Sequence, residues 1–180
     1  MKKTITILGF LVTIIGYAQV TEIKYLDKIF PESVVNALII QKSANEIYNK
    51  SLNWVKESYK NPSEVIKTTI ENEMIRFEGI KADGVSSKVL GSKMFYSVKY
   101  TISLYFKDNK YKFEINSVDY AISTPGANTD LKNITYCYKN SGEIRGLYSY
   151  VPTDIESLLN DLNSSLYLYI EKESTQKKEW

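Results

Sequence analysis

The chain has 180 residues, of which 43% are apolar and 24% are charged, a balance typical of one folded domain rather than a disordered segment. It contains no histidine and a single cysteine, Cys137. These counts exclude Ser-His and Cys-His nucleophile pairs, histidine and Cys-x-x-Cys metal sites, and an intramolecular disulfide.

The first eighteen residues have the features of a signal peptide. Two lysines precede the apolar stretch Ile5–Ile15, which is too short to span a bilayer as an anchor. Gly16 and Ala18 are small residues at the spacing of a cleavage site, so we expect cleavage before Gln19. No cysteine follows to which a lipid could be attached. We therefore predict that residues 1–18 are removed and that the mature chain, without a membrane span, is exported to the periplasm or the extracellular space.

Removal of the signal peptide also changes the charge. It would leave 162 residues and take away two lysines, so the 23 basic residues of the chain fall to 21, which equals the number of acidic residues. A nucleic-acid-binding protein needs a basic field that releases counterions from phosphates. Zero net charge therefore argues against nucleic acid as the partner.

The mature chain begins with residues 19–33, which the sequence leaves open between an extended arm and a short helix. Residues 34–40 are mostly apolar and branched, and we interpret them as a strand buried on both faces or nearly so. Ser43 and Glu46 have the spacing of a capping box, which predicts a helix that ends before Pro62. Its core face is expected to consist of Ala44, Ile47, Tyr48, Leu52, Trp54, Val55 and Tyr59.

Two short paired strands are predicted next, at residues 65–70 and 74–80, joined by a loop at Asn72 and Glu73. In this register apolar residues face each other on one side of the hairpin and opposite charges on the other. The expected pairs are Ile70 with Ile75, Thr68 with Phe77, and Lys67 with Glu78. Residues 81–93 contain Asp-Gly, Ser-Ser and Gly-Ser pairs, and we interpret them as a flexible connection.

The clearest pattern lies in residues 94–107, where apolar and polar side chains alternate throughout. This period of two predicts a long strand with one covered face, followed by a two-residue turn at Asp108 and Asn109. The expected pairs are Phe106 with Tyr111, Leu104 with Phe113 and Ile102 with Ile115 on the core face, and Tyr105 with Lys112, Ser103 with Glu114 and Thr101 with Asn116 on the other. The apolar phase slips after Ser117, which predicts a β-bulge near Asn116 or Ser117.

The last third of the chain is less regular. Residues 123–133 are interpreted as a loop, and residues 134–138 and 143–150 as a small extra hairpin. A capping-box pattern with Thr153 as the cap predicts a long amphipathic helix. Its apolar stripe is expected to consist of Ile155, Leu158, Leu159, Leu162, Leu166, Tyr169 and Ile170.

The order of strand, helix, four strands and helix resembles an exported bacterial family of unknown function whose domain has a TATA-binding-protein-like (TBP-like) fold. The resemblance is carried by Ile47-Tyr48, Trp54-Val55, Tyr59, Phe77-Glu78-Gly79, Tyr100-Thr101-Ile102 and Lys107-Asp108-Asn109-Lys110-Tyr111. It implies an α+β fold in which two helices pack on one face of an antiparallel sheet, and it implies no activity. We therefore expect a single TBP-like domain over residues 34–173, followed by a polar tail at residues 174–180.

The sheet face opposite the helices would carry mostly polar side chains. These are Lys67, Thr69, Arg76, Glu78, Lys99, Thr101, Ser103, Tyr105, Lys112, Glu114 and Asn116. DNA-binding members of the fold use this face, but here acidic side chains partly cancel the basic ones, and an exported protein would rarely meet DNA. A solvated face is the simplest interpretation. If the face binds a partner, the candidate residues are Lys99, Thr101, Tyr105, Lys112 and Glu114.

Three functions remain open. We favour an exported, non-enzymatic module that binds a protein, a glycan or another envelope component through the open sheet face or the long loops. Tyrosine side chains would supply contact area at low entropic cost. The alternative is a carrier with a cavity for a small apolar ligand under Leu159, Leu162 and Leu166. An enzyme based on carboxylates would need a perturbed Asp or Glu in a concave pocket. We expect no catalytic residue, metal or cofactor, and we expect Cys137 to be half-buried and unreactive.

Overall fold

The computed structural model describes residues 20–24, 33–89, 91–122 and 132–172. The predicted signal peptide and polar tail lie outside these residues. The elements, in chain order, are β1 (Val34–Ala37), α1 (Ala44–Ser58), α2 (Pro62–Val65), β2 (Ile66–Ile70), β3 (Met74–Val89), β4 (Ser92–Lys107), β5 (Lys110–Ile122), β6 (Lys132–Asn133), the 3₁₀ helices η1 (Ile134–Cys137) and η2 (Gly146–Tyr148), and α3 (Val151–Glu171). The antiparallel sheet has the strand order β1-β5-β4-β3-β2, and β6 pairs with β5.

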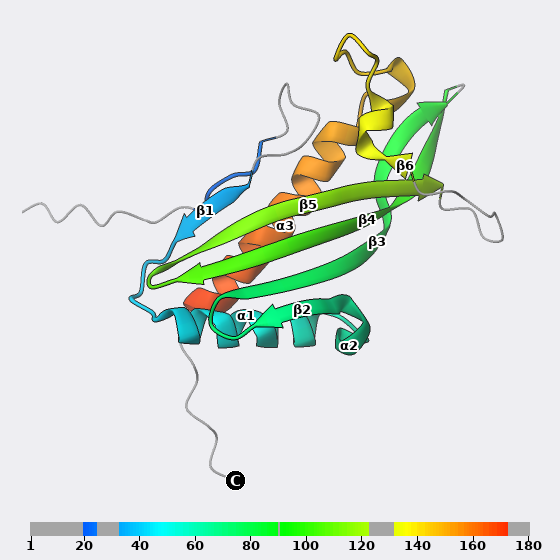
Figure 1. Cartoon of the computed structure of the whole chain (residues 1–180). Coiled ribbons are helices and arrows are strands. Elements are labelled where there is room, and N and C mark those ends of the chain that lie inside the picture. The colour runs from blue at the N-terminus through cyan, green and yellow to red at the C-terminus, as the bar shows by residue number, and fades with distance from the viewer. Residues whose placement is uncertain (1–19, 25–32, 90, 123–131, 173–180) are drawn as a thin grey trace, which may run out of the picture.

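Both long helices cover the same face of the sheet. In Figure 1, α3 crosses behind the strands and α1 lies along the β2 edge. Trp54 of α1 contacts Phe77 of β3 edge to face, with 5.8 Å between the ring centroids. The Tyr111 hydroxyl of β5 donates to Asn163 Oδ1 of α3 over 2.9 Å. The α+β class, the antiparallel sheet and the two helices on one face are therefore confirmed.

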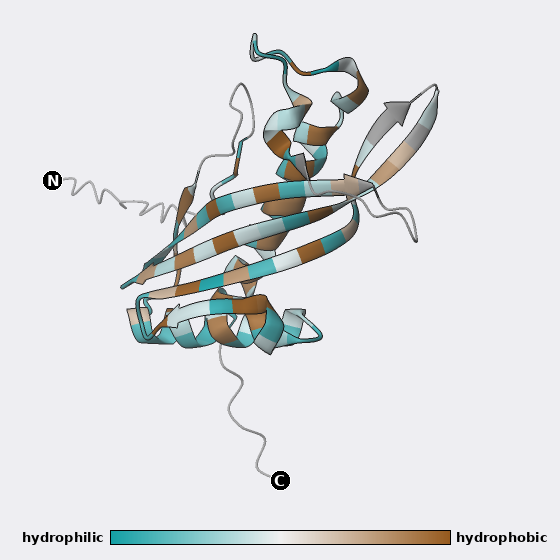
Figure 2. Ribbon diagram, turned by 45° about the vertical axis from the view of Figure 1, so that its right-hand side comes forward, coloured by the Kyte–Doolittle hydropathy of each residue, from teal (hydrophilic) through white to brown (hydrophobic). Residues whose placement is uncertain are grey.

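The β4–β5 hairpin forms as predicted, and Figure 2 shows apolar and polar residues alternating along its strands. All three predicted core-face pairs are present, and Asn109 adopts a left-handed φ of 63° in the turn. Beyond the pair of Ile102 with Ile115, the register shifts so that Thr101 lies opposite Ser117. Asn116 is thus the extra residue of the predicted bulge. The predicted pair of Thr101 with Asn116 is wrong, because Asn116 is the unpaired bulge residue and Thr101 pairs with Ser117 instead.

The start of α1 also agrees with its sequence. Ser43 Oγ accepts a hydrogen bond from the Glu46 N–H over 3.3 Å, and the Glu46 carboxylate accepts one from the Ser43 N–H over 2.8 Å. The capping box is therefore confirmed. The Asp108 carboxylate accepts a further bond from the Ala44 N–H over 2.8 Å, so the β4–β5 turn is tied to the start of this helix.

β1 is buried on one face only, which corrects the prediction of burial on both faces. Val34 and Asn36 are buried, whereas Val35 and Ala37 are exposed. The strand lies at the sheet edge beside β5, and its outer side chains belong to the face that the helices leave open. The strand ends at Ala37, so the predicted range was too long.

The β2–β3 hairpin has a register one residue away from the predicted one. Residues 71–73 form a three-residue turn in which Asn72 adopts a left-handed φ of 61°. The observed pairs are Ile70 with Met74, Thr69 with Ile75, Thr68 with Arg76 and Ile66 with Phe77. Ile70 consequently faces solvent, with 47% of its surface exposed. The predicted contact between Lys67 and Glu78 still forms, with 3.7 Å between Nζ and Oε1.

Residues 81–93 do not form the predicted flexible connection. β3 and β4 both extend into this segment and stay paired on either side of a β-bulge between Lys81 and Val85. Within the bulge, Asp83 has a left-handed φ of 53°. Val85 is only 1% exposed, so the segment contributes to the core. Of the small residues that suggested a loop, Asp83 and Gly84 lie within the bulge.

The region between β5 and α3 differs from its prediction as well. Residues 123–131 of the predicted loop lie outside the described residues, and Lys132–Asn133 forms β6 rather than loop. The predicted extra hairpin is reduced to a single β-bridge between Tyr138 and Ile144, flanked by η1 and η2. Local 3₁₀ turns replace the strands.

α3 begins earlier than predicted. Pro152 lies in its first turn, where the missing N–H costs no intrahelical hydrogen bond. Thr153 is therefore inside the helix, and its predicted role as the cap is wrong. The Asp154 carboxylate accepts hydrogen bonds from the Ser86 N–H and Oγ over 2.8 and 2.9 Å, which fixes the start of α3 to β3.

The described part of the N-terminal arm, residues 20–24, lies outside the predicted domain but packs on it. These residues form no helix, so the short-helix alternative is wrong for them. Ile23 is completely buried in the same hydrophobic core as the sheet and helices. Residues 25–32 lie outside the described residues.

Candidate functional site

The five residues predicted for binding all project from the open face of the sheet. Tyr105 lies directly opposite Lys112, and Glu114 lies on the same face one pair further along β5. Lys99 and Thr101 follow along β4, on the far side of the bulge. Tyr105 is 36% exposed, whereas the other four are half-buried.

These residues form two separate clusters of interactions. In the first, Lys99 Nζ lies 3.1 Å from Glu78 Oε2, and Lys67 approaches the same carboxylate. In the second, the Glu114 carboxylate pairs with the Lys112 ammonium and accepts from the Tyr105 hydroxyl over 3.4 Å. The face therefore neutralises much of its own charge.

Ser103, at the centre of the open face, bonds to a neighbour on each side of β4. It is completely buried, although its side chain points away from the helices. Its hydroxyl accepts from Arg76 Nε over 3.0 Å and donates to Asn116 Oδ1 over 2.7 Å. Sequence reasoning placed Ser103 on this face but could not show that long neighbouring side chains cover it.

The turn end of the β4–β5 hairpin carries a hollow of about 260 Å³, which we call the hairpin-end hollow. It is lined by Val35, Tyr105, Phe106, Lys107, Lys110, Tyr111 and Lys112. Lys107 lies directly opposite Lys110, an arrangement of like charges that is unfavourable across paired strands. Neither lysine makes an ion pair with any of the described residues. The hollow thus combines unneutralised positive charge with the exposed side chains of Tyr105 and Val35.

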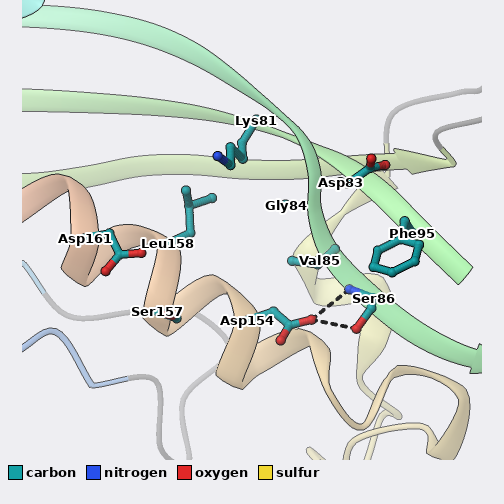
Figure 3. A pocket seen from close by; sticks show the side chains of 10 residues that line it. All are labelled: Lys81, Asp83, Gly84, Val85, Ser86, Phe95, Asp154, Ser157, Leu158 and Asp161. Atoms are coloured by element: carbon teal, nitrogen blue, oxygen red, sulfur yellow. Dashed lines mark hydrogen bonds between the residues drawn. The ribbon is translucent and has the colours of Figure 1, made fainter. Parts of the chain in front are cut away.

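A second hollow of about 250 Å³ lies between the β3 bulge and the first half of α3 (Figure 3). It is lined by Lys81, Asp83, Gly84, Val85, Ser86, Phe95, Asp154, Ser157, Leu158 and Asp161. The Asp154 carboxylate is already bonded to Ser86, so its role here is structural. Within the described residues, no group of three or more His, Cys, Asp or Glu side chains is placed to hold a metal ion.

The carrier hypothesis gains no support from the packing under α3. Leu159 and Leu166 are completely buried in the core, and Leu162 is partly buried against it. The two hollows described above are lined by other residues. The leucines therefore stabilise the fold by close packing.

The single cysteine is completely buried rather than half-buried as expected. Burial raises the pKa of the Cys137 thiol to about 11. Since the thiolate is the reactive form of cysteine, this shift disfavours nucleophilic chemistry at neutral pH.

Replacing Lys112 with alanine is expected to raise the pKa of Glu114. The hydrogen bond from Lys112 is the main cause that lowers the pKa of this carboxyl below its ordinary value, with smaller help from Asn116 and Tyr105. A lowered pKa in the folded state means that this contribution to stability is present above the ordinary pKa and is lost as the pH falls through the lowered value. NMR titration of the side-chain carboxyl measures the shift.

The matched control for this titration is Lys139→Ala, which removes a lysine that pairs with Glu143 outside the sheet. It should leave the pKa of Glu114 unchanged. An unchanged pKa in the Lys112→Ala variant would show that the ion pair does not persist in solution.

An antiparallel sheet with two long helices on one face and the other face open defines a TBP-like α+β domain. Residues 36–121 match the family model described as "Domain of unknown function (DUF4468) with TBP-like fold". The matched residues include most of the sheet and α1, but not α3. The family resemblance expected from the sequence is thus confirmed.

Two solved structures share this fold. A DUF4468 family protein from Bacteroides ovatus ATCC 8483 matches with a TM-score of 0.61 and 14% identity, covering 81% of this chain and 88% of that protein. A TBP-like protein from Parabacteroides distasonis ATCC 8503 matches with a TM-score of 0.59 and 16% identity, covering 79% and 93%. No curated protein matches the chain. Among the described residues, no helix is both long and apolar enough to cross a membrane.

Proposed function

We propose that the chain is an exported, non-enzymatic binding module whose partner is a protein, glycan or other envelope component that presents anionic groups to the hairpin-end hollow. The observation that carries this proposal is the pair of facing lysines, Lys107 and Lys110, beside the exposed Tyr105. Export is supported by the signal-peptide features of residues 1–18.

Like charges that face each other across paired strands destabilise a hairpin unless an opposite charge neutralises them. An anionic group placed in the hollow would relieve the repulsion between Lys107 and Lys110, while Tyr105 and Val35 offer apolar contact area. Lys112 is already paired with Glu114 and lies 5.6 Å from the centroid of the Tyr105 ring, which holds that ring in place. The acidic Glu78 and Glu114 along the same face disfavour a long polyanion such as nucleic acid.

The test measures binding of the mature chain to polygalacturonate, an anionic glycan, with neutral dextran as the control ligand. A Lys107→Ala/Lys110→Ala double variant should bind about tenfold more weakly, since exposed charge pairs contribute up to about 1 kcal/mol each. A Tyr105→Ala variant should weaken the binding that remains when salt screens the charges.

The matched control is Lys56→Ala/Lys60→Ala, which removes the same charge from exposed positions in and after α1. It should bind as the unmodified chain does. Equal losses in the two double variants would mean that net charge alone explains the binding. Binding to vesicles that contain phosphatidylglycerol but not to polygalacturonate would assign the anionic group to a lipid.

A further inference from the structure

A short segment of the chain is held in a groove almost entirely by side-chain amides. Residues 20–24 lie against β1 and α3 (Figure 1). The groove is formed by Asn36 of β1 and by Asn160 and Asn163 of α3, and we call it the asparagine groove. The two helix residues are three positions apart, so they share one face of α3.

The asparagine groove contacts the backbone of two alternate residues of the segment. At Thr21, the N–H donates to Asn36 Oδ1 over 2.9 Å and the carbonyl accepts from Asn163 Nδ2 over 3.0 Å. At Ile23, the N–H donates to Asn160 Oδ1 over 2.8 Å and the carbonyl accepts from Asn160 Nδ2 over 2.9 Å. Every polar backbone group on one edge of an extended peptide is thus satisfied.

Ile23 is the one completely buried side chain of the segment, and Val20 is partly buried against the same core. Thr21, Glu22 and Lys24 are exposed. Thr21 adds one bond from its hydroxyl to the Val35 carbonyl over 2.9 Å. Backbone hydrogen bonds together with pockets for alternate apolar side chains are the elements by which proteins recognise extended peptides.

The groove is organised by contacts that do not involve the segment. Asn36 Nδ2 donates to Asn163 Oδ1 over 2.9 Å, and the Tyr111 hydroxyl donates to the same oxygen over 2.9 Å. Burial raises the pKa of Tyr111, which keeps its hydroxyl protonated as a donor. These bonds orient the amides of Asn36 and Asn163 before any peptide arrives, which lowers the entropic cost of binding.

We infer that the asparagine groove is a binding site for an extended peptide with a branched aliphatic residue at the Ile23 position, and that the chain fills it with its own residues 20–24. The segment belongs to the same chain as the groove, so its binding is intramolecular and competes with any separate peptide. A separate peptide therefore binds only when the tethered segment is displaced. The asparagines of this site differ from the residues that line the hairpin-end hollow, although Tyr111 and Val35 contact both.

The test uses the full mature chain with Ile23→Asp, which removes the anchor and releases the segment. A fluorescently labelled peptide of residues Gln19 to Lys24 is added, and its anisotropy is followed. Saturable binding is expected to the Ile23→Asp variant and not to the unmodified chain at the same concentrations. A peptide that itself carries Asp at the Ile23 position is expected not to bind.

Adding Asn160→Ala to the Ile23→Asp variant should weaken binding of the labelled peptide about tenfold or more, because two hydrogen bonds from the Asn160 amide to the peptide backbone are lost. If the Ile23→Asp variant lacks a cooperative thermal transition, Ile23→Ala replaces it, since that change removes most of the buried anchor without introducing a charge. Absence of saturable binding to a folded release variant would overturn the inference. Binding that is unaffected by Asn160→Ala would do so as well.

Discussion

A Gly79→Ala variant is expected to lose about 3 kcal/mol of folding stability, because the added methyl group has no room. Gly79 lies directly opposite Tyr100 in the β3–β4 pair. A Cβ atom at this position would lie 2.5 Å from Tyr100 Cζ and 2.6 Å from Cε2, whereas carbon atoms in contact are about 3.5–4.0 Å apart. The Tyr100 ring cannot easily move, because it is 3% exposed and its hydroxyl shares a 2.9 Å hydrogen bond with Tyr59.

Urea denaturation measures this loss, and the matched control is Gly146→Ala. A Cβ at Gly146 would meet nothing within 4 Å, so that variant should retain its stability within about 0.5 kcal/mol. In thermal unfolding, the Gly79→Ala midpoint should fall by roughly 6–12 °C. Equal midpoints for the two glycine variants would show that the Tyr100 ring can reposition without cost.

The parts of the fold that were predictable are those whose determinants are close together in the sequence. The β4–β5 hairpin has a two-residue turn, and one register satisfies both of its faces, so local alternation was sufficient. The capping box of α1 is likewise a local signal. Gly79, by contrast, belonged to a recognised motif, but its contact with Tyr100 depends on the pairing of two strands.

The wrong predictions concern features that local composition and alternation do not determine. The β2–β3 register depends on whether Asn72 adopts a left-handed conformation, and the charge pairing that favoured the predicted register survives in the observed one. Residues 81–93 have the composition of a loop, yet residues 81–89 and 92–93 belong to β3 and β4, which pair there, and Val85 is buried. The first outcome depends on a backbone conformation that composition does not determine, and the second on the pairing of two long strands.

The candidate site was predictable in part for the same reason. Alternation correctly placed Lys99, Thr101, Tyr105, Lys112 and Glu114 on the open face. The hairpin-end hollow depends on Val35 of β1, which lies beside Lys112 through a long-range pairing. The asparagine groove did have a signal: Asn163 falls on the apolar stripe of α3, where a polar residue must find partners.

An Asn163→Ala variant is expected to lose about 4 kcal/mol of folding stability, more than most single substitutions. Asn163 is completely buried, and its amide bonds to Asn36, Tyr111 and the Thr21 carbonyl. Truncation leaves Asn36 Nδ2 and the Thr21 carbonyl without this partner, while the Tyr111 hydroxyl keeps only the Asn163 carbonyl over 3.3 Å. Each buried unsatisfied group costs about 1–3 kcal/mol.

The matched control is Asn49→Ala, which removes an exposed asparagine from α1 whose amide bonds only to Asn45 of the same helix. Alanine is the better helix former, so this variant should be as stable as the unmodified chain or slightly more so. Urea denaturation of both variants separates burial from residue type. Asn163 bonds to β1, β5 and the N-terminal segment. Its loss should therefore release residues 20–24 more often and make the chain more susceptible to proteolysis. A small loss in Asn163→Ala would mean that water enters the groove and replaces the amide, and the groove would then be wet rather than preorganised.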